Sequence, residues 1–242
     1  MIHDAAANAV GEVLVDGQRK GHCVLVAPHL AVTCAHVLSM ATERPAFRPT
    51  LRFPRLGLET TAKVTGWRAF DPGLAAGTDI ALLELRGGAP DRSCVQYDAN
   101  RPPTGAEVVA FEYQTGRADG DPREAAVHFG KGSVISLKGH RFIDAGMSGT
   151  GLFYRDPGER LLGLVAWRPG TEGQTEAYAI PADEILKLIE DSTPRSVTDV
   201  APALFEAMTA CFLAQVGDNL RPMLQDFVEA ARRVIEKDAA VW

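Results

Sequence analysis

Short apolar stretches separated by glycine or proline are the feature that most restricts the fold of this chain. The predicted strands cover residues 10–15, 23–26, 30–34, 62–65, 80–85, 107–111, 126–129, 133–137, 150–153, 162–167 and 177–180. The chain holds 23 glycines and 15 prolines among its 242 residues, and nearly every gap between these stretches contains one of them. Strands at this spacing are typical of an antiparallel barrel or sandwich. The sequence lacks the strand–helix–strand alternation of a parallel sheet.

Helical periodicity replaces the short strands after Pro181. A short helix is predicted at residues 182–190 and, after a break, two longer helical segments are predicted between residues 198 and 235. We therefore predict a strand-rich domain at residues 1–191 and an α-helical hairpin at residues 196–242. The hairpin must bury its apolar face, and three arrangements are open: packing on the strand-rich domain, self-association, or docking of a protein partner.

Charge and composition narrow the classes of function. The 25 Lys and Arg residues against 31 Asp and Glu residues give a net charge of −6, which disfavours binding to nucleic acid or to anionic membranes. No apolar run approaches the ~18–20 residues that span a bilayer, and the first residues lack the pattern of a secretory signal. We therefore expect a cytoplasmic protein. The four cysteines form no C-x-x-C pair, which predicts reduced thiols and neither a disulfide scaffold nor a metal site.

Three polar residues stand next to predicted strands in the order His36, Asp79 and Ser148. A serine hydroxyl is a weak nucleophile that needs a base, and a neutral imidazole can take its proton and later return it. A buried carboxylate holds the tautomer of that imidazole. Ser148 lies between Gly146 and Gly149, and glycine allows backbone N–H groups to face a developing oxyanion. This order of residues predicts a catalytic triad.

These segments resemble the chymotrypsin/trypsin-like serine protease family, in particular its compact, disulfide-free bacterial branch that includes the HtrA-type proteases. The resemblance covers about residues 8–191. It rests on residues 33–36 (TCAH, family T-A-A-H), 79–83 (DIALL, family D-I-A-L-L), 146–149 (GMSG, family G-x-S-G), 163–167 (GLVAW, family G-I-V-S-W) and 177–181 (AYAIP, the last strand). It implies an all-β fold of two six-stranded antiparallel Greek-key barrels with a C-terminal helix.

The resemblance also implies roles for the site residues. His36 would be the general base, Asp79 would orient it, Ser148 would be the nucleophile, and the amides of Gly146 and Ser148 would form the oxyanion hole. The implied activity is a serine endopeptidase that acts on a protein or peptide through an acyl-enzyme and needs no cofactor. Because bacterial trypsin-like domains often accompany signalling and defence modules, an effector role is also implied. The alternative is a latent or weakly active protease fold that acts as a binding or signalling module through its helical tail.

Three positions depart from the family pattern. Val37 stands where secreted relatives have a disulfide-bonded cysteine, which is consistent with a reducing compartment. Met147 stands where zymogen-activated relatives have an aspartate that pairs with a new N-terminus, so that switch is not expected. Thr150 replaces the second glycine after the serine, a mild change that does not indicate inactivation.

The predicted substrate pocket comprises Phe142, Ala166, Trp167, Arg168 and Glu176. Phe142 occupies the position of the pocket aspartate in trypsin, so a trypsin-like preference does not follow by that route. Two interpretations remain open. Glu176 could select a basic residue before the cleaved bond, or Arg168 could pair with Glu176 and narrow the pocket.

Histidines and a cysteine near His36 admit other interpretations. His22 and His29 could form a metal site with His36, but their places next to predicted turns favour surface positions. Cys34 could be a nucleophile for His36. That is disfavoured because the segment Gly146-Met147-Ser148-Gly149 already supplies a nucleophile.

Overall fold

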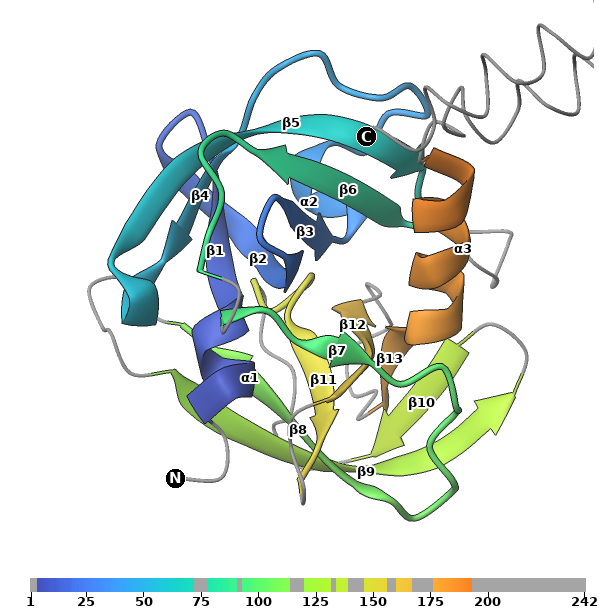
Figure 1. Ribbon diagram of the computed structural model, residues 1–242. Coiled ribbons are helices and arrows are strands. Elements are labelled where there is room, and N and C mark those ends of the chain that lie inside the picture. The colour runs from blue at the N-terminus through green and yellow to red at the C-terminus, as the bar shows by residue number, and fades with distance from the viewer. Residues whose placement is uncertain are drawn as a thin grey trace, which may run out of the picture. The chain divides into compact units, whose positions relative to one another are not determined.

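The computed structural model describes residues 4–71, 78–90, 93–113, 120–131, 134–138, 146–155, 160–166 and 176–192 (Figure 1). For residues 4, 129–131 and 176 it describes the backbone alone. The chain divides into two units, Met1–Ser192 and Thr193–Trp242. The second unit lies outside the described residues, and so does the hairpin predicted at residues 196–242.

The first half of the described unit is a closed barrel of six antiparallel strands, in the order β1-β2-β3-β6-β5-β4. The strands are β1 (Val10–Val15), β2 (Gln18–Ala27), β3 (Leu30–Thr33), β4 (Thr50–Phe53), β5 (Leu58–Arg68) and β6 (Ile80–Leu85). Side chains of β5 alternate along much of its length, with Ala62 and Val64 buried and Lys63 exposed. This alternation places one face of the strand in the barrel interior and the other in solvent.

The second half is also a six-stranded antiparallel barrel, which the pairing of β11 with β12 closes. Its strands are β8 (Glu107–Glu112), β9 (Asp121–Lys131), β10 (Val134–Lys138), β11 (Gly151–Tyr154), β12 (Arg160–Ala166) and β13 (Glu176–Pro181). The two-residue strand β7 (Gln96–Tyr97) pairs parallel to β12 at its outer edge. The predicted all-β fold of two barrels is confirmed.

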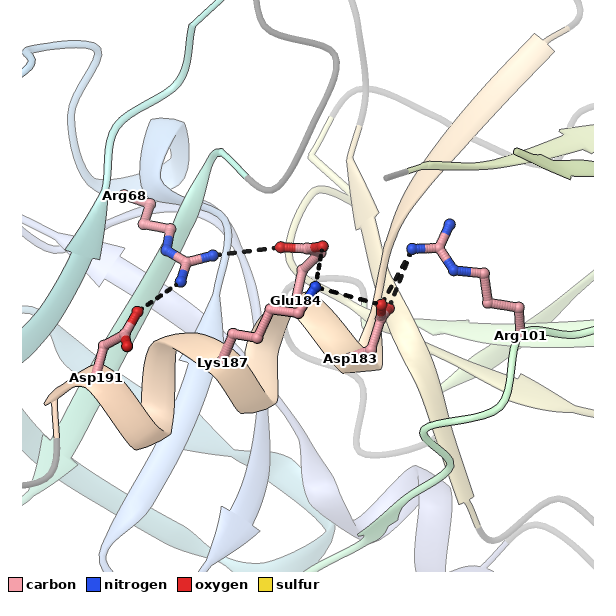
Figure 2. A network of polar contacts seen from close by, with 6 residues as sticks. All are labelled: Arg68, Arg101, Asp183, Glu184, Lys187 and Asp191. Carbon is pink, nitrogen blue, oxygen red and sulfur yellow. Dashed lines mark hydrogen bonds and ion pairs between the residues drawn. The ribbon is translucent and has the colours of Figure 1, made fainter. Parts of the chain in front are cut away.

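Helix α3 (Ala182–Ser192) follows β13 and connects elements of both barrels (Figures 1 and 2). Its Ile185 and Leu188 are buried in the large apolar cluster that also contains residues of both barrels. At its polar side, Arg68 at the end of β5 pairs with Glu184 and Asp191, and Arg101 pairs with Asp183. Because partly exposed ion pairs contribute little, we assign the stability of this contact to the buried apolar face.

Several short elements were not predicted from the sequence. These are α1 (Asp4–Ala9), α2 (Ala35–Leu38), the 3-10 turn η1 (Pro54–Leu56), β4 and β7. Strand β5 is also longer than its predicted core at residues 62–65. Its threonine- and glutamate-rich start carries no apolar period, and backbone pairing with β4 and β6 extends it on both sides. Within the described residues, no helix combines the length and apolar character needed to cross a bilayer.

Candidate active site

His36 and Asp79 meet at one edge of the first barrel. His36 lies in α2, directly after β3, and Asp79 directly precedes β6. Since β3 and β6 pair antiparallel, the end of one strand lies beside the start of the other. The Asp79 carboxylate accepts two hydrogen bonds from His36, from the backbone N–H to Oδ1 at 2.8 Å and from Nδ1 to Oδ2 at 2.7 Å. A proton on Nδ1 leaves Nε2 as the nitrogen that can accept another.

The backbone of Asp79 adopts a left-handed conformation that non-glycine residues seldom take. Its φ is +70°, which costs about 1–2 kcal/mol for an L-residue. Two hydrogen bonds hold it there: its N–H donates to the carbonyl of Ala69, and its own carbonyl accepts from the N–H of Ala35, both at 3.1 Å. Strain that the surroundings enforce in this way is typical of functional sites.

Burial distinguishes the two partners. The Asp79 side chain is 7% exposed and the His36 side chain is 19% exposed. The ring of Phe70 stands edge-on to the imidazole with 6.1 Å between ring centroids. The carboxylate is therefore shielded from water while part of the imidazole remains open to a reacting group.

Ser148 lies in a tight turn just before β11. Both flanking glycines have positive φ, +102° for Gly146 and +85° for Gly149, a conformation that glycine adopts without strain. The N–H of Thr150 donates to the carbonyl of Met147 at 3.1 Å and closes the turn. Ser148 itself is 5% exposed. The catalytic roles of His36, Asp79 and Ser148, and of the Gly146 and Ser148 amides, stay predictions.

The threonine after this turn has a structural role. Thr150 is fully buried, and its hydroxyl donates a hydrogen bond to the carbonyl of Phe111 in β8 at 2.7 Å. Its backbone carbonyl accepts from the N–H of Val165 in β12 at 2.8 Å. The threonine hydroxyl therefore ties the turn to β8, whereas the backbone bond to β12 would be open to glycine as well.

Gly149 approaches the first barrel very closely. A Cβ atom at this position would lie 2.1 Å from the carbonyl oxygen of His22 and 2.5 Å from Oγ1 of Thr33. Real Cβ contacts are never this short, and one of the two obstacles is backbone. Glycine is therefore required here for steric reasons in addition to its φ.

His22 is not at the surface, as the sequence suggested, but fully buried in β2. Its imidazole contacts the serine turn: Nδ1 lies 2.9 Å from the carbonyl oxygen of Gly146, and Nε2 accepts a hydrogen bond from the N–H of Tyr113 at 3.1 Å. The prediction was wrong because the strand begins at Gln18 rather than residue 23. The one available signal was the apolar run directly after His22. His29, by contrast, is exposed as expected.

Burial, and to a smaller extent the nearby positive charge of Arg19, lower the pKa of His22 from 6.5 to about 4. The unfolded chain therefore binds more protons than the folded chain between these two values, and stability falls as the pH falls through this window. We expect His22 to make the protein about 2 kcal/mol less stable at about pH 5 than at about pH 7.5. Urea denaturation at both pH values measures this difference, and His22→Asn should lack it. An equal pH dependence in the two proteins would contradict the prediction.

Cys34 lies next to the pair of His36 and Asp79, and one ligand atom from each of the three residues lies within 4.8 Å of the others. Its thiol is fully buried, and burial raises its pKa well above the ordinary value. The Sγ atom also donates to the carbonyl of Val165 at 3.4 Å. A protonated, buried thiol is a poor nucleophile and a poor metal ligand, and Nδ1 and Oδ2 are already engaged with each other.

Of the five residues predicted to line the substrate pocket, Ala166 and Glu176 lie among the residues that the structure describes. Ala166 is buried at the end of β12. Glu176 begins β13, where it is paired with Lys138 of β10, and its side chain lies outside the described part. Phe142, Trp167 and Arg168 lie outside the described residues altogether. Both interpretations of Arg168 and Glu176 stay predictions.

Comparisons with known structures point to one fold. An inactive form of Rv3671c from M. tuberculosis is 17% identical, with a TM-score of 0.59, over 81% of this chain and 91% of that one. Neuropsin from mouse brain is 12% identical, with a TM-score of 0.59, over 78% and 96%. The HtrA-type protease AlgW, solved with a decapeptide, is 18% identical, with a TM-score of 0.58, over 78% and 65%. No curated protein matches the sequence.

Residues 21–164, more than half of the chain, match the family model of the trypsin-like peptidase domain. This range contains His36, Asp79 and Ser148, and the two barrels agree with the structures of serine proteases named above. The chain therefore belongs to the trypsin-like peptidase domain family and is a serine peptidase with the chymotrypsin-like fold.

Proposed function

We propose that the chain is a serine endopeptidase that cleaves peptide bonds through an acyl-enzyme on Ser148. The observation that carries the proposal is the pair of hydrogen bonds from His36 to the Asp79 carboxylate, at 2.8 and 2.7 Å. Asp79 accepts a hydrogen bond from the Nδ1–H group of His36, which orients the imidazole and leaves Nε2 as the nitrogen that can accept a proton. The glycine-flanked turn at residues 146–149 follows the family pattern of the nucleophile.

The proposed reaction proceeds in two steps. His36 Nε2 takes the Ser148 hydroxyl proton while Oγ attacks the peptide carbonyl, and the amides of Gly146 and Ser148 stabilise the resulting oxyanion. The C–N bond then breaks and His36 gives the proton to the leaving amine, which forms the acyl-enzyme. In the second step His36 takes a proton from a water molecule that attacks the ester. The bond between Ser148 Oγ and the acyl carbon then breaks, Oγ receives the proton from His36, and the acid is released. No cofactor takes part in either step.

We also propose a cellular setting. The substrate would be a protein or peptide in the cytoplasm, and the enzyme would act as a bacterial defence or signalling effector, with residues 196–242 as the segment that binds a partner or a second copy. The buried thiols of Cys23 and Cys34, which form no disulfide, are consistent with a reducing compartment.

Labelling with a fluorophosphonate probe tests the proposed activity. The probe phosphonylates a serine only when a neighbouring base activates it. We expect the wild-type protein to be labelled and Ser148→Ala to remain unlabelled, with intact-protein mass spectrometry as the measurement. The matched control is Ser39→Ala, which follows α2 and should label as the wild type does. A wild-type protein that stays unlabelled, both as the full chain and after removal of residues 196–242, would favour the binding-module alternative.

A further inference from the structure

We propose that His22 is a positioning residue that holds the peptide between Gly146 and Met147 in the orientation required for the oxyanion hole. The proposal rests on the function proposed above, because it assumes that the amides of Gly146 and Ser148 bind the oxyanion. Those two amides lie on either side of the peptide that His22 contacts. His22 does not touch the reacting atoms in this scheme and acts through the turn.

Three groups of His22 face the serine turn. Its backbone N–H donates to the carbonyl of Ser148 at 2.8 Å. Its backbone carbonyl accepts from Oγ1 of Thr33 at 2.6 Å and lies where a side chain on Gly149 would stand. Its ring Nδ1 lies 2.9 Å from the Gly146 carbonyl. Any residue could make the two backbone contacts, so the histidine ring is needed only for the third.

The partners of the ring determine which nitrogen carries the proton. The N–H of Tyr113 points at Nε2 at 3.1 Å, so Nε2 must present its lone pair. The proton of a neutral ring therefore lies on Nδ1 and is donated to the Gly146 carbonyl. Burial keeps the ring neutral at physiological pH, as the lowered pKa of His22 indicates. One imidazole thus acts as an acceptor on one side and a donor on the other.

The group that fixes the ring is itself anchored. Tyr113 is fully buried just after β8, and its hydroxyl donates to the carbonyl of Ala7 in α1 at 2.6 Å. Its own carbonyl accepts a hydrogen bond from the guanidinium of Arg19 in β2. A series of hydrogen bonds therefore runs from α1 through Tyr113 and His22 to the serine turn, and it joins the two barrels at the site.

The turn needs such an anchor because Gly146 has no side chain to restrict it. Glycine can rotate through conformations closed to other residues, and the peptide after Gly146 can change orientation unless its carbonyl is held. The next residue, Met147, is buried in the core of the second barrel but is apolar, so it cannot form an ion pair that would hold the turn. The His22 ring supplies a polar contact from the first barrel.

Three substitutions at His22 test the proposal. His22→Leu removes both ring hydrogen bonds. His22→Asn keeps a donor near the position of Nδ1, and His22→Gln places its amide near the position of Nε2. We expect His22→Leu to lower the second-order rate of fluorophosphonate labelling at Ser148 by about 10- to 100-fold, because loss of a whole oxyanion donor costs about 10²–10³. His22→Asn should restore the rate to within about fivefold of wild type, and His22→Gln should restore less.

Separate measurement of kcat and KM distinguishes a positioning role of His22 from a loss of stability. With a peptide ester substrate, His22→Leu should lower kcat by the same factor as the labelling rate and change KM by less than about threefold. Val64→Ala, a core change in β5 away from the site, serves as the control. It should lower the melting temperature and leave the labelling rate, measured well below that temperature, unchanged.

The orientation of the peptide supplies a readout that does not depend on activity. A crystal structure of His22→Leu should show the Gly146 carbonyl turned away from its wild-type direction. An unchanged peptide, or a labelling rate equal to that of wild type, would overturn the role of His22. A wild-type protein that is not labelled at Ser148 would instead overturn the proposed function, and the crystal structure would still decide whether His22 holds the turn.

Discussion

Asp79→Asn is expected to lower kcat by about 10⁴-fold while the protein remains folded, the order of magnitude for this change in a Ser-His-Asp triad. The carboxylate offers one oxygen to the backbone N–H of His36 and the other to Nδ1. An asparagine has one oxygen for these two donors. If that oxygen keeps the backbone contact, its NH₂ group faces Nδ1 and forces the proton to Nε2, where it blocks the base.

The measurement is steady-state hydrolysis of a peptide ester, with thermal unfolding recorded on the same samples. Asp183→Asn on α3 is a matched control, since it removes a partly exposed ion pair with Arg101 and should change kcat by less than about twofold. A loss of less than about tenfold in Asp79→Asn would mean that Asp79 does not orient the base.

Gly149→Ala should destabilise the described unit by roughly 3–5 kcal/mol, at the upper end of the effects of single substitutions. The added Cβ would lie 2.1 Å from the His22 carbonyl, so β2 and the serine turn would have to move apart. The hydrogen bond from the His22 N–H to the Ser148 carbonyl spans the same gap and would be strained or broken. Labelling at Ser148 should therefore fall together with stability.

Gly17→Ala is the control that separates steric overlap from backbone conformation. Gly17 has a φ of +75°, close to that of Gly149, but a Cβ there would meet nothing within 4 Å. Gly17→Ala should therefore lower the free energy of unfolding by only about 1–2 kcal/mol, through backbone strain. Thermal unfolding measures both variants, and at about 2–4 °C for each kcal/mol Gly149→Ala should melt several degrees below Gly17→Ala. Equal melting temperatures would show that the turn can move away from β2 at little cost.

The barrel strands could be predicted because their signal is local. An apolar stretch bounded by glycine or proline carries its own evidence, and residues 80–85 match β6 at both ends. The short motifs around His36, Asp79 and Ser148 could also be identified from the sequence, since each is a run of adjacent residues. Strands β4 and β7 were missed because they are too short to carry a local signal. β4 has four residues and β7 has two, and each depends on pairing with a strand distant in the sequence.

The residues that hold the site could not be found in this way. The ring of His22 contacts a carbonyl 124 positions away, and the hydroxyl of Tyr113 contacts one 106 positions away. No spacing in the chain records either contact. The mistaken surface position of His22 followed from placing the start of β2 five residues too late, a boundary that cross-strand pairing with β1 decides.

By itself, the sequence determined the class of fold, the order of the strands along the chain and the identity of the candidate triad, because these depend on apolar stretches bounded by glycine or proline and on short motifs. Only the tertiary structure decided that Gly149 must be glycine, that Thr150 ties the serine turn to β8, and that His22 is a buried, neutral hydrogen-bonding residue. The physical reason is that steric overlap, desolvation and hydrogen bonding depend on distances between atoms, and the closing of two barrels sets those distances.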